Sequence, residues 1–177
     1  MVEDIAKIPQ PRIQVSSTET YSRNVLGPVY FELCNLRFAG QAEAPLPPGA
    51  VAPKQDQYII ASDEEYVMSV DVKFNNTPLT RLLLCLGMQV EICFSLEAIG
   101  GKAKDVDITE SIVTVKDQLE YTIVHKGTPD ADGIKPSFYA GAAVATVMPP
   151  EHPCSPRSPF GFGYIATVLV QVYEAFS

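Results

Sequence analysis

The side chains best suited to catalysis or metal binding are few and scattered in this chain. Its only histidines are His125 and His152, and its four cysteines are widely separated. Zinc sites usually draw four ligands from closely spaced pairs of Cys or His. A cysteine nucleophile needs an oriented histidine, and Cys154 near His152 carries no local signature of such a pair. We therefore predict no catalytic residue, no bound metal and no cofactor.

Aspartates provide a carboxylate-rich alternative. Asp105 and Asp107 lie in KAKDVDITE, while Asp130 and Asp132 lie in TPDADG. Gathered at one end of a β-sandwich, these carboxylates would suit a calcium ion. Asp105, Asp107 and Asp132 with His125 would instead suit a pocket for a small molecule. The simpler interpretation is that turn aspartates accept hydrogen bonds from nearby backbone N–H groups. A calcium-dependent adhesion module and a ligand-binding or hydrolytic β-barrel stay open as alternatives.

Proline-rich stretches suggest a different chemistry, contact with another protein. Residues 45–53 and 149–159 include the Pro-x-x-Pro spacing that aromatic grooves recognise. Two phenylalanines follow the second stretch, at the start of an apolar run. The candidate protein-contact residues are Pro45, Pro48, Pro153, Pro156, Phe160 and Phe162. The alternative interpretation is that proline only stiffens these loops and that they bind no partner. For the proline spacing taken by itself, this alternative is favoured.

Alternation of apolar and polar residues predicts the strands that would position these side chains. The clearest run is Tyr66–Phe74, and others cover residues 28–38, 90–98, 106–115, 119–125, 137–148 and 160–176. Because strands and helices do not alternate, we predict an antiparallel two-sheet sandwich of eight or nine strands. In the last run, the alternation puts Phe162, Tyr164 and Val168 on one face and Leu169 on the opposite face.

One short helix is predicted near residues 78–86. Leucines recur there at helical spacing, namely Leu79, Leu82, Leu83 and Leu86. Thr77 is a good N-cap residue, Pro78 suits the first helical position, and Gly87 suits the position after the helix end. A strand through LLLCL is the competing interpretation.

One stretch carries a resemblance to a known fold. Residues 132–147, DGIKPSFYAGAAVATV, resemble the corner before the sixth strand of fibronectin type III and other immunoglobulin-like domains. In those domains a tyrosine hydroxyl bonds back to upstream backbone, so the resemblance implies a structural role for Tyr139. The chain has no Trp, whereas these families typically carry one in the core. Such sandwiches often serve as adhesion, scaffold or accessory modules, although a fold does not fix a function.

Composition narrows the class of protein. The chain has 177 residues, 46% of them hydrophobic, and a net charge of -8. That charge disfavours nucleic acid as a ligand, and no apolar run reaches the roughly 18 residues of a membrane span. The acidic start of the chain and its scattered cysteines predict a cytoplasmic protein with reduced thiols. We expect an arm at residues 1–24 and a single domain at 25–177.

These observations together favour a binding protein over an enzyme. We expect a non-enzymatic protein–protein interaction or assembly module that acts through strand edges and loops. Its partner would be another protein or a second copy of the chain. Self-association would use an edge strand, either from residues 11–17 or from the carboxyl-terminal strand.

Overall fold

The computed structural model describes residues 29–40, 58–101, 103–155 and 157–175. The predicted arm at residues 1–24 and the proline-rich stretch with Pro45 and Pro48 lie outside these ranges, as does Pro156. The described residues form helix α1 (Pro78–Cys85) and eight strands. The strands are β1 (Phe31–Gly40), β2 (Ile59–Ala61), β3 (Tyr66–Phe74), β4 (Gln89–Ala98), β5 (Val106–Val113), β6 (Glu120–Gly127), β7 (Ser137–Met148) and β8 (Gly161–Tyr173).

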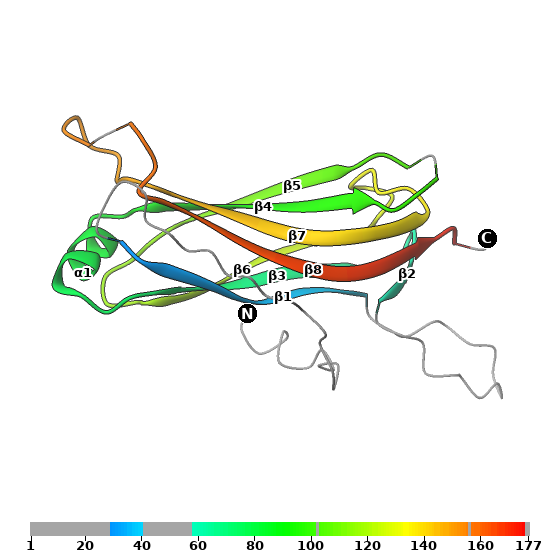
Figure 1. The fold of residues 1–177 in the computed structure, drawn as a ribbon, viewed down its shortest axis with the longest axis horizontal. Coiled ribbons are helices and arrows are strands. Elements are labelled where there is room, and N and C mark those ends of the chain that lie inside the picture. The colour runs from blue at the N-terminus through cyan, green and yellow to red at the C-terminus, as the bar shows by residue number, and fades with distance from the viewer. Residues whose placement is uncertain (1–28, 41–57, 102, 156, 176–177) are drawn as a thin grey trace.

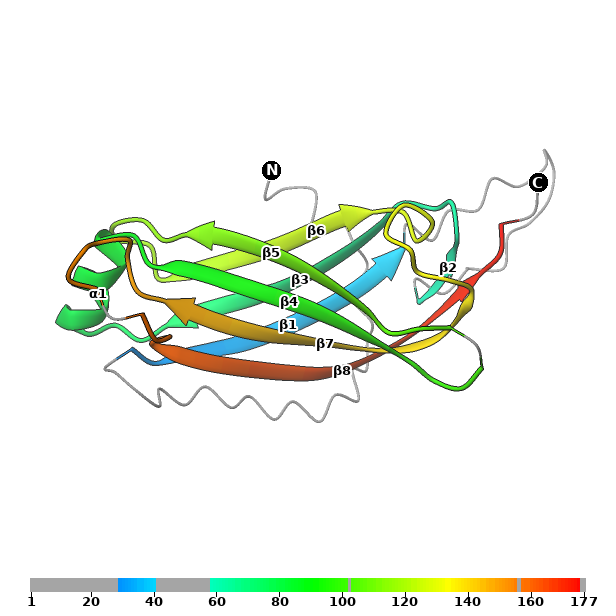
Figure 2. The same cartoon turned by 90° about the horizontal axis from the view of Figure 1, so that it is seen from above.

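The strands form two sheets, which confirms the prediction of a mainly β protein with one helix. One sheet has the order β1-β3-β6 and the other β2-β8-β7-β4-β5. Strand β1 of the first sheet lies alongside β8 of the second, and β6 of the first lies alongside β5 of the second (Figures 1 and 2). The two sheets therefore pack face to face and approach each other along both of their long sides. The expectation of purely antiparallel sheets is wrong at one place, because β2 pairs with β8 in parallel. Strand β2 is only three residues long and was not predicted from the sequence.

The core lies between the sheets and follows the period-two pattern. In β3, Tyr66 and every second residue up to Phe74 are buried, and β4 buries the set from Val90 to Leu96. Side chains that point inward from both sheets form one continuous apolar cluster. A cavity beside Phe38 and Met68, between the sheets, measures only about 10 Å³. The core at that place is therefore closely packed and has no room for a ligand.

Strand β8 does not keep one alternation along its length. Gly141 of β7 is paired with Val168, but the next residue, Ala142, is paired with Ala166, so Thr167 is an extra residue in β8. Such a β-bulge shifts the alternation, because the side-chain period of a strand is two residues. Before the bulge Ile165 points inward, and after it Val168 does.

This bulge corrects the face predicted for the first half of β8. Phe162 and Tyr164 are exposed, while Val168 and Val170 are buried. The aromatic residues therefore share the outer face of the sheet with Leu169. A single alternation had placed them opposite it.

Helix α1 begins and ends where the sequence predicted. The Thr77 side chain accepts a hydrogen bond from the Thr80 backbone N–H at 3.2 Å, and Pro78 occupies the first turn. Gly87 follows with φ of +83°, a conformation that glycine adopts without strain. The helix is buried through Thr80 and Leu84. Leu79 and Leu82 of the helix and Leu86 at its C-cap are exposed.

Candidate functional site

The most densely connected group of ionisable side chains surrounds His125. On β6, His125 places Nδ1 2.9 Å from Glu110 Oε1 of β5 and Nε2 3.2 Å from Asp132 Oδ2. Tyr66 donates its hydroxyl to the same Asp132 oxygen at 2.7 Å. The His125 side chain is 13% exposed. This His125 cluster joins the edge of one sheet to the edge of the other, since β5 and β6 belong to different sheets.

The surroundings of His125 favour its charged form. Burial by itself lowers the pKa of His125, but the hydrogen bonds with Glu110 and Asp132 and the charges of these carboxylates outweigh it, so the pKa is raised. Burial and the bond to Asp132 raise the pKa of Tyr66. Both ring nitrogens of His125 are engaged by carboxylates on opposite sides of the ring. The imidazole therefore offers no lone pair to a metal ion or a substrate, and the cluster acts as a bridge between the sheets.

The four candidate aspartates do not converge on one point. The carboxylate of Asp130 accepts a bond from Ser62 Oγ, and that of Asp107 accepts one from Ser95 Oγ. Asp105 accepts a bond from the Ala98 backbone N–H, which is the local role expected of an aspartate near a turn. Within the described part of the chain, no group of three or more His, Cys, Asp or Glu side chains could hold a metal ion.

The described contact candidates divide between surface and core. Pro153 is exposed in the loop before β8, and Phe162 is exposed on β8 itself. Phe160 is partly buried against the core. In the same loop, the His152 ring accepts a bond from the backbone N–H of Cys154 at 3.1 Å. The two residues thus meet through the backbone, and the thiol of Cys154 takes no part in this bond.

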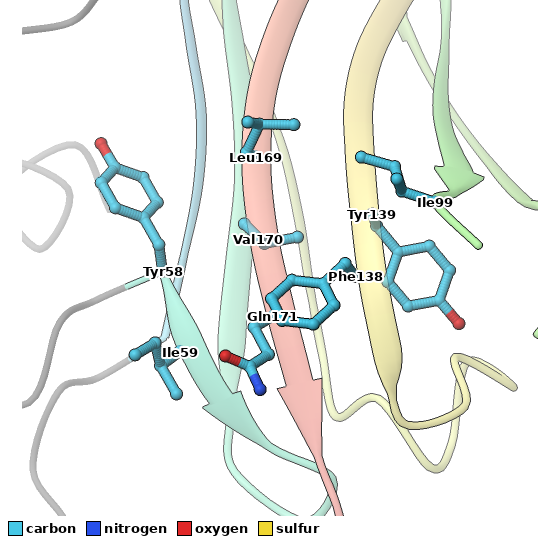
Figure 3. Close-up of a pocket in the computed structure, with 8 residues that line it drawn as sticks. All are labelled: Tyr58, Ile59, Ile99, Phe138, Tyr139, Leu169, Val170 and Gln171. Atoms are coloured by element: carbon cyan, nitrogen blue, oxygen red, sulfur yellow. The ribbon is translucent and has the colours of Figure 1, made fainter. Parts of the chain in front are cut away.

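A groove lies on the outer face of the five-stranded sheet, where β2, β8 and β7 meet (Figure 3). Its volume is about 350 Å³. The backbone N–H of Gln171 donates to the Tyr58 carbonyl, and that of Ile99 donates to the Phe138 carbonyl, which fixes the two sides of the groove. The lining is almost entirely apolar and comprises Tyr58, Ile59, Ile99, Phe138, Tyr139, Leu169, Val170 and Gln171.

The apolar surface continues from the groove along β7 and β8. Leu169 is 62% exposed and Phe138 55% exposed, while Phe162 and Tyr164 are each 45% exposed. Tyr164 is paired with Val144, which is also exposed. Neither strand contains a single Asp, Glu, Lys or Arg. We call this surface, from the groove to Phe162, the β7–β8 face.

Of the residues on the β7–β8 face, the predicted contact candidates included Phe162. A usable signal was present, because residues 137–148 and 160–173 are two long runs without charge. An outward strand face exposed to water is usually polar, so the absence of charge pointed to a covered surface. The bulge at Thr167 hid the continuity of the face, because it reverses the alternation halfway along β8.

Comparisons with known proteins leave the family open. No protein-family model matches the chain, and no curated protein matches it. Among solved structures, it is similar to a beta-glucosidase from Listeria innocua, with a TM-score of 0.37 and 11% identity, over 88% of this chain and 16% of that one. The same enzyme in complex with isofagomine gives 0.37 and 11%, over 96% and 19%. The chain thus spans less than a fifth of that enzyme's length, and a similarity this low carries no functional argument.

The helix content of the described residues can be compared with what a membrane span requires. Their single helix, α1, has eight residues. No helix among them is long and apolar enough to cross a lipid bilayer.

Proposed function

We propose that this protein is a non-enzymatic protein–protein interaction module and that the β7–β8 face is its binding surface. The observation that carries the proposal is the extent of this uncharged face, on which five large apolar side chains are between 45% and 62% exposed: Ile99, Phe138, Phe162, Tyr164 and Leu169. Contiguous apolar patches of this kind are rare on soluble monomers and commonly mark interaction sites. Aromatic side chains are also enriched at the centres of protein interfaces.

The two alternative functions have less support. A hydrolytic or ligand-binding barrel needs an internal pocket with converging polar groups. The cavity beside Phe38 and Met68 is about 10 Å³, and His125 has both ring nitrogens engaged by carboxylates. A calcium-dependent module needs clustered oxygen ligands, whereas Asp107 bonds to Ser95 on β4 and Asp130 bonds to Ser62 in the turn after β2. The exposed β7–β8 face therefore favours binding of protein over either alternative.

We also propose that the fold is an immunoglobulin-like sandwich. Strands β1, β3 and β6 in one sheet and β8, β7 and β4 in the other correspond to strands A, B, E and G, F, C of that fold. The Tyr139 hydroxyl donates to the Lys135 carbonyl at 2.7 Å, as in the tyrosine corner of these domains. This relationship supports a binding role by analogy only.

Affinity capture with matched variants tests the proposed function. The immobilised full chain, Leu169→Glu and Leu82→Glu would each be exposed to extract of the native cells, and bound proteins would be identified by mass spectrometry. Leu82 is 55% exposed on α1 and serves as the control, away from the β7–β8 face. We expect the unmodified chain and Leu82→Glu to retain the same proteins and Leu169→Glu to lose them. Equal retention by all three, or by none, would contradict the proposal.

A further inference from the structure

We propose that the β7–β8 face binds the same face of a second copy of this chain, forming a two-fold symmetric dimer. This inference rests on the proposed function and names the partner of that surface. In a dimer of this kind, each residue on one copy meets a partner residue on the other, and every contact occurs twice. The face must therefore be complementary to itself in charge, in shape and in spacing.

Charge is the first requirement, and the face meets it. Because neither β7 nor β8 carries a charged residue, two copies bring no like charges together along these strands and leave no charge buried without a partner. The exposed carboxylates of Glu91 and Glu97 on β4 lie beside the face and would stay at its rim. An uncharged face offers no ion pair to a charged ligand such as a basic peptide.

Shape is the second requirement. Large side chains project at one end of the face, at Phe162 and Tyr164, and the groove of about 350 Å³ opens at the other end, around Leu169. Between them the outer face carries small residues, Ala142 and Ala166, which are directly paired. Small side chains at the middle let two sheets approach closely. The projecting end of one copy can then enter the groove of the other.

The strand register supplies the spacing. Tyr164 of β8 is paired with Val144 of β7, which lies two residues from Ala142 in one direction. Leu169 of β8 is paired with Ala140 of β7, which lies two residues from Ala142 in the other direction. A two-fold axis that lies in the interface and crosses the strands at Ala142 exchanges these two levels. Tyr164 of one copy therefore faces Leu169 of the other, and the reverse contact forms simultaneously.

The size of the face predicts a weak, reversible dimer. Strand β7 has 12 residues, so the two strands of the face span roughly 40 Å by 10 Å, or on the order of 400 Å² per copy. Stable interfaces bury about 600–1,000 Å² on each partner, and smaller ones are typical of transient association. The expected dimer should therefore dissociate on dilution.

Sedimentation of the full chain over a wide concentration range tests the inference. We expect a monomer–dimer equilibrium, weakened about thirtyfold or more by either Tyr164→Lys or Leu169→Glu. Both positions are exposed, so neither substitution disturbs the core. The decisive sample is an equimolar mixture of the two variants. Its heterodimer has one native contact and one contact between the introduced lysine and the introduced glutamate. Association should therefore recover in the mixture. Recovery would also show that both variants are folded.

Several outcomes would overturn the dimer. The first is a monomer at every concentration, and the second is no recovery of association on mixing the two variants. The third is a dimer that survives both substitutions, which is the result expected if the copies assemble through a strand edge. Dissociation by Leu82→Glu alone would assign the contact to the exposed leucines of α1. If the chain stays monomeric but captures another protein through Leu169, the proposed function stands and only the dimer is wrong. If neither occurs, both are wrong.

Discussion

At the scale of single residues, the His125 cluster connects the two sheets, and both ring nitrogens of its imidazole are used in that connection. Glu110 on β5 and Asp132 after β6 engage opposite sides of one imidazole ring. Hydrogen bonds to charged groups contribute more to stability than neutral ones, about 1.5–3 kcal/mol in favourable cases. Since β5 and β6 are edge strands of different sheets, this contribution holds the two edges together.

The raised pKa of His125 predicts a specific dependence of stability on pH. Because the folded protein holds the imidazole proton more tightly than the unfolded chain, the stabilisation is complete below about pH 6.5, the ordinary histidine value. It is lost as the pH rises through the raised folded-state pKa. The free energy of unfolding, measured by urea denaturation at a series of pH values, should therefore decline across this interval.

Two variants isolate the contribution of His125. In His125→Gln the decline should be absent, because the titrating ring has been removed. In Glu110→Gln it should be reduced, because the imidazole keeps only Asp132 as a charged partner. An equal pH dependence in the unmodified chain and in His125→Gln would show that other groups are responsible.

At the scale of elements, close approach of β8 to β1 depends on Gly163. A Cβ atom at this position would lie 2.5 Å from Cε2 of Phe31, whose ring is buried in the core. Overpacking of this kind usually costs about 1–3 kcal/mol. We expect Gly163→Ala to lower the free energy of unfolding by that amount, measured in urea.

A second substitution at the same contact provides the control. Phe31→Leu removes the part of the ring that the new methyl group would meet. The double variant should therefore be more stable than the sum of the two single effects predicts. Additive effects would mean that Gly163 is required for a reason other than its contact with Phe31.

Most elements were predictable from the sequence because their signals are local. Helix α1 followed from Thr77, Pro78 and Gly87, and the alternation in β3 and β4 identified the inward faces. Strand β2 was not predictable, since its three residues form a strand only through pairing with Gln171–Tyr173 of β8. The bulge at Thr167 likewise depends on how β8 pairs with β7.

The candidate site was less accessible to sequence reasoning than the fold. Phe162 was identified as a contact residue, but its neighbours Leu169 and Phe138 were not. These residues are far apart in the chain or on opposite sides of a bulge, so their union into one surface depends on the pairing of β7 with β8. The exposed leucines of α1 show the same limit. Their helical spacing was evident, but only the packing of α1 through Leu84 determines that the leucines point outward.

At the scale of the whole molecule, charge and apolar surface are separated. The chain carries a net charge of -8, yet the β7–β8 face has no charged residue on its two central strands. Long-range repulsion between copies therefore opposes association, while the contact itself gains from removing apolar surface from water. The two contributions respond differently to salt.

This separation predicts that salt strengthens self-association. The Debye length falls from about 20 Å to about 7 Å as the salt concentration rises from about 20 mM to 200 mM, which screens repulsion between the acidic copies. The dimer dissociation constant, measured by sedimentation equilibrium, should therefore fall several-fold over this range. Glu97→Gln, at the rim of the face, should reduce the salt dependence by removing one like charge from each copy. A dissociation constant that rises with salt would instead indicate a contact made by opposite charges, which the β7–β8 face does not have.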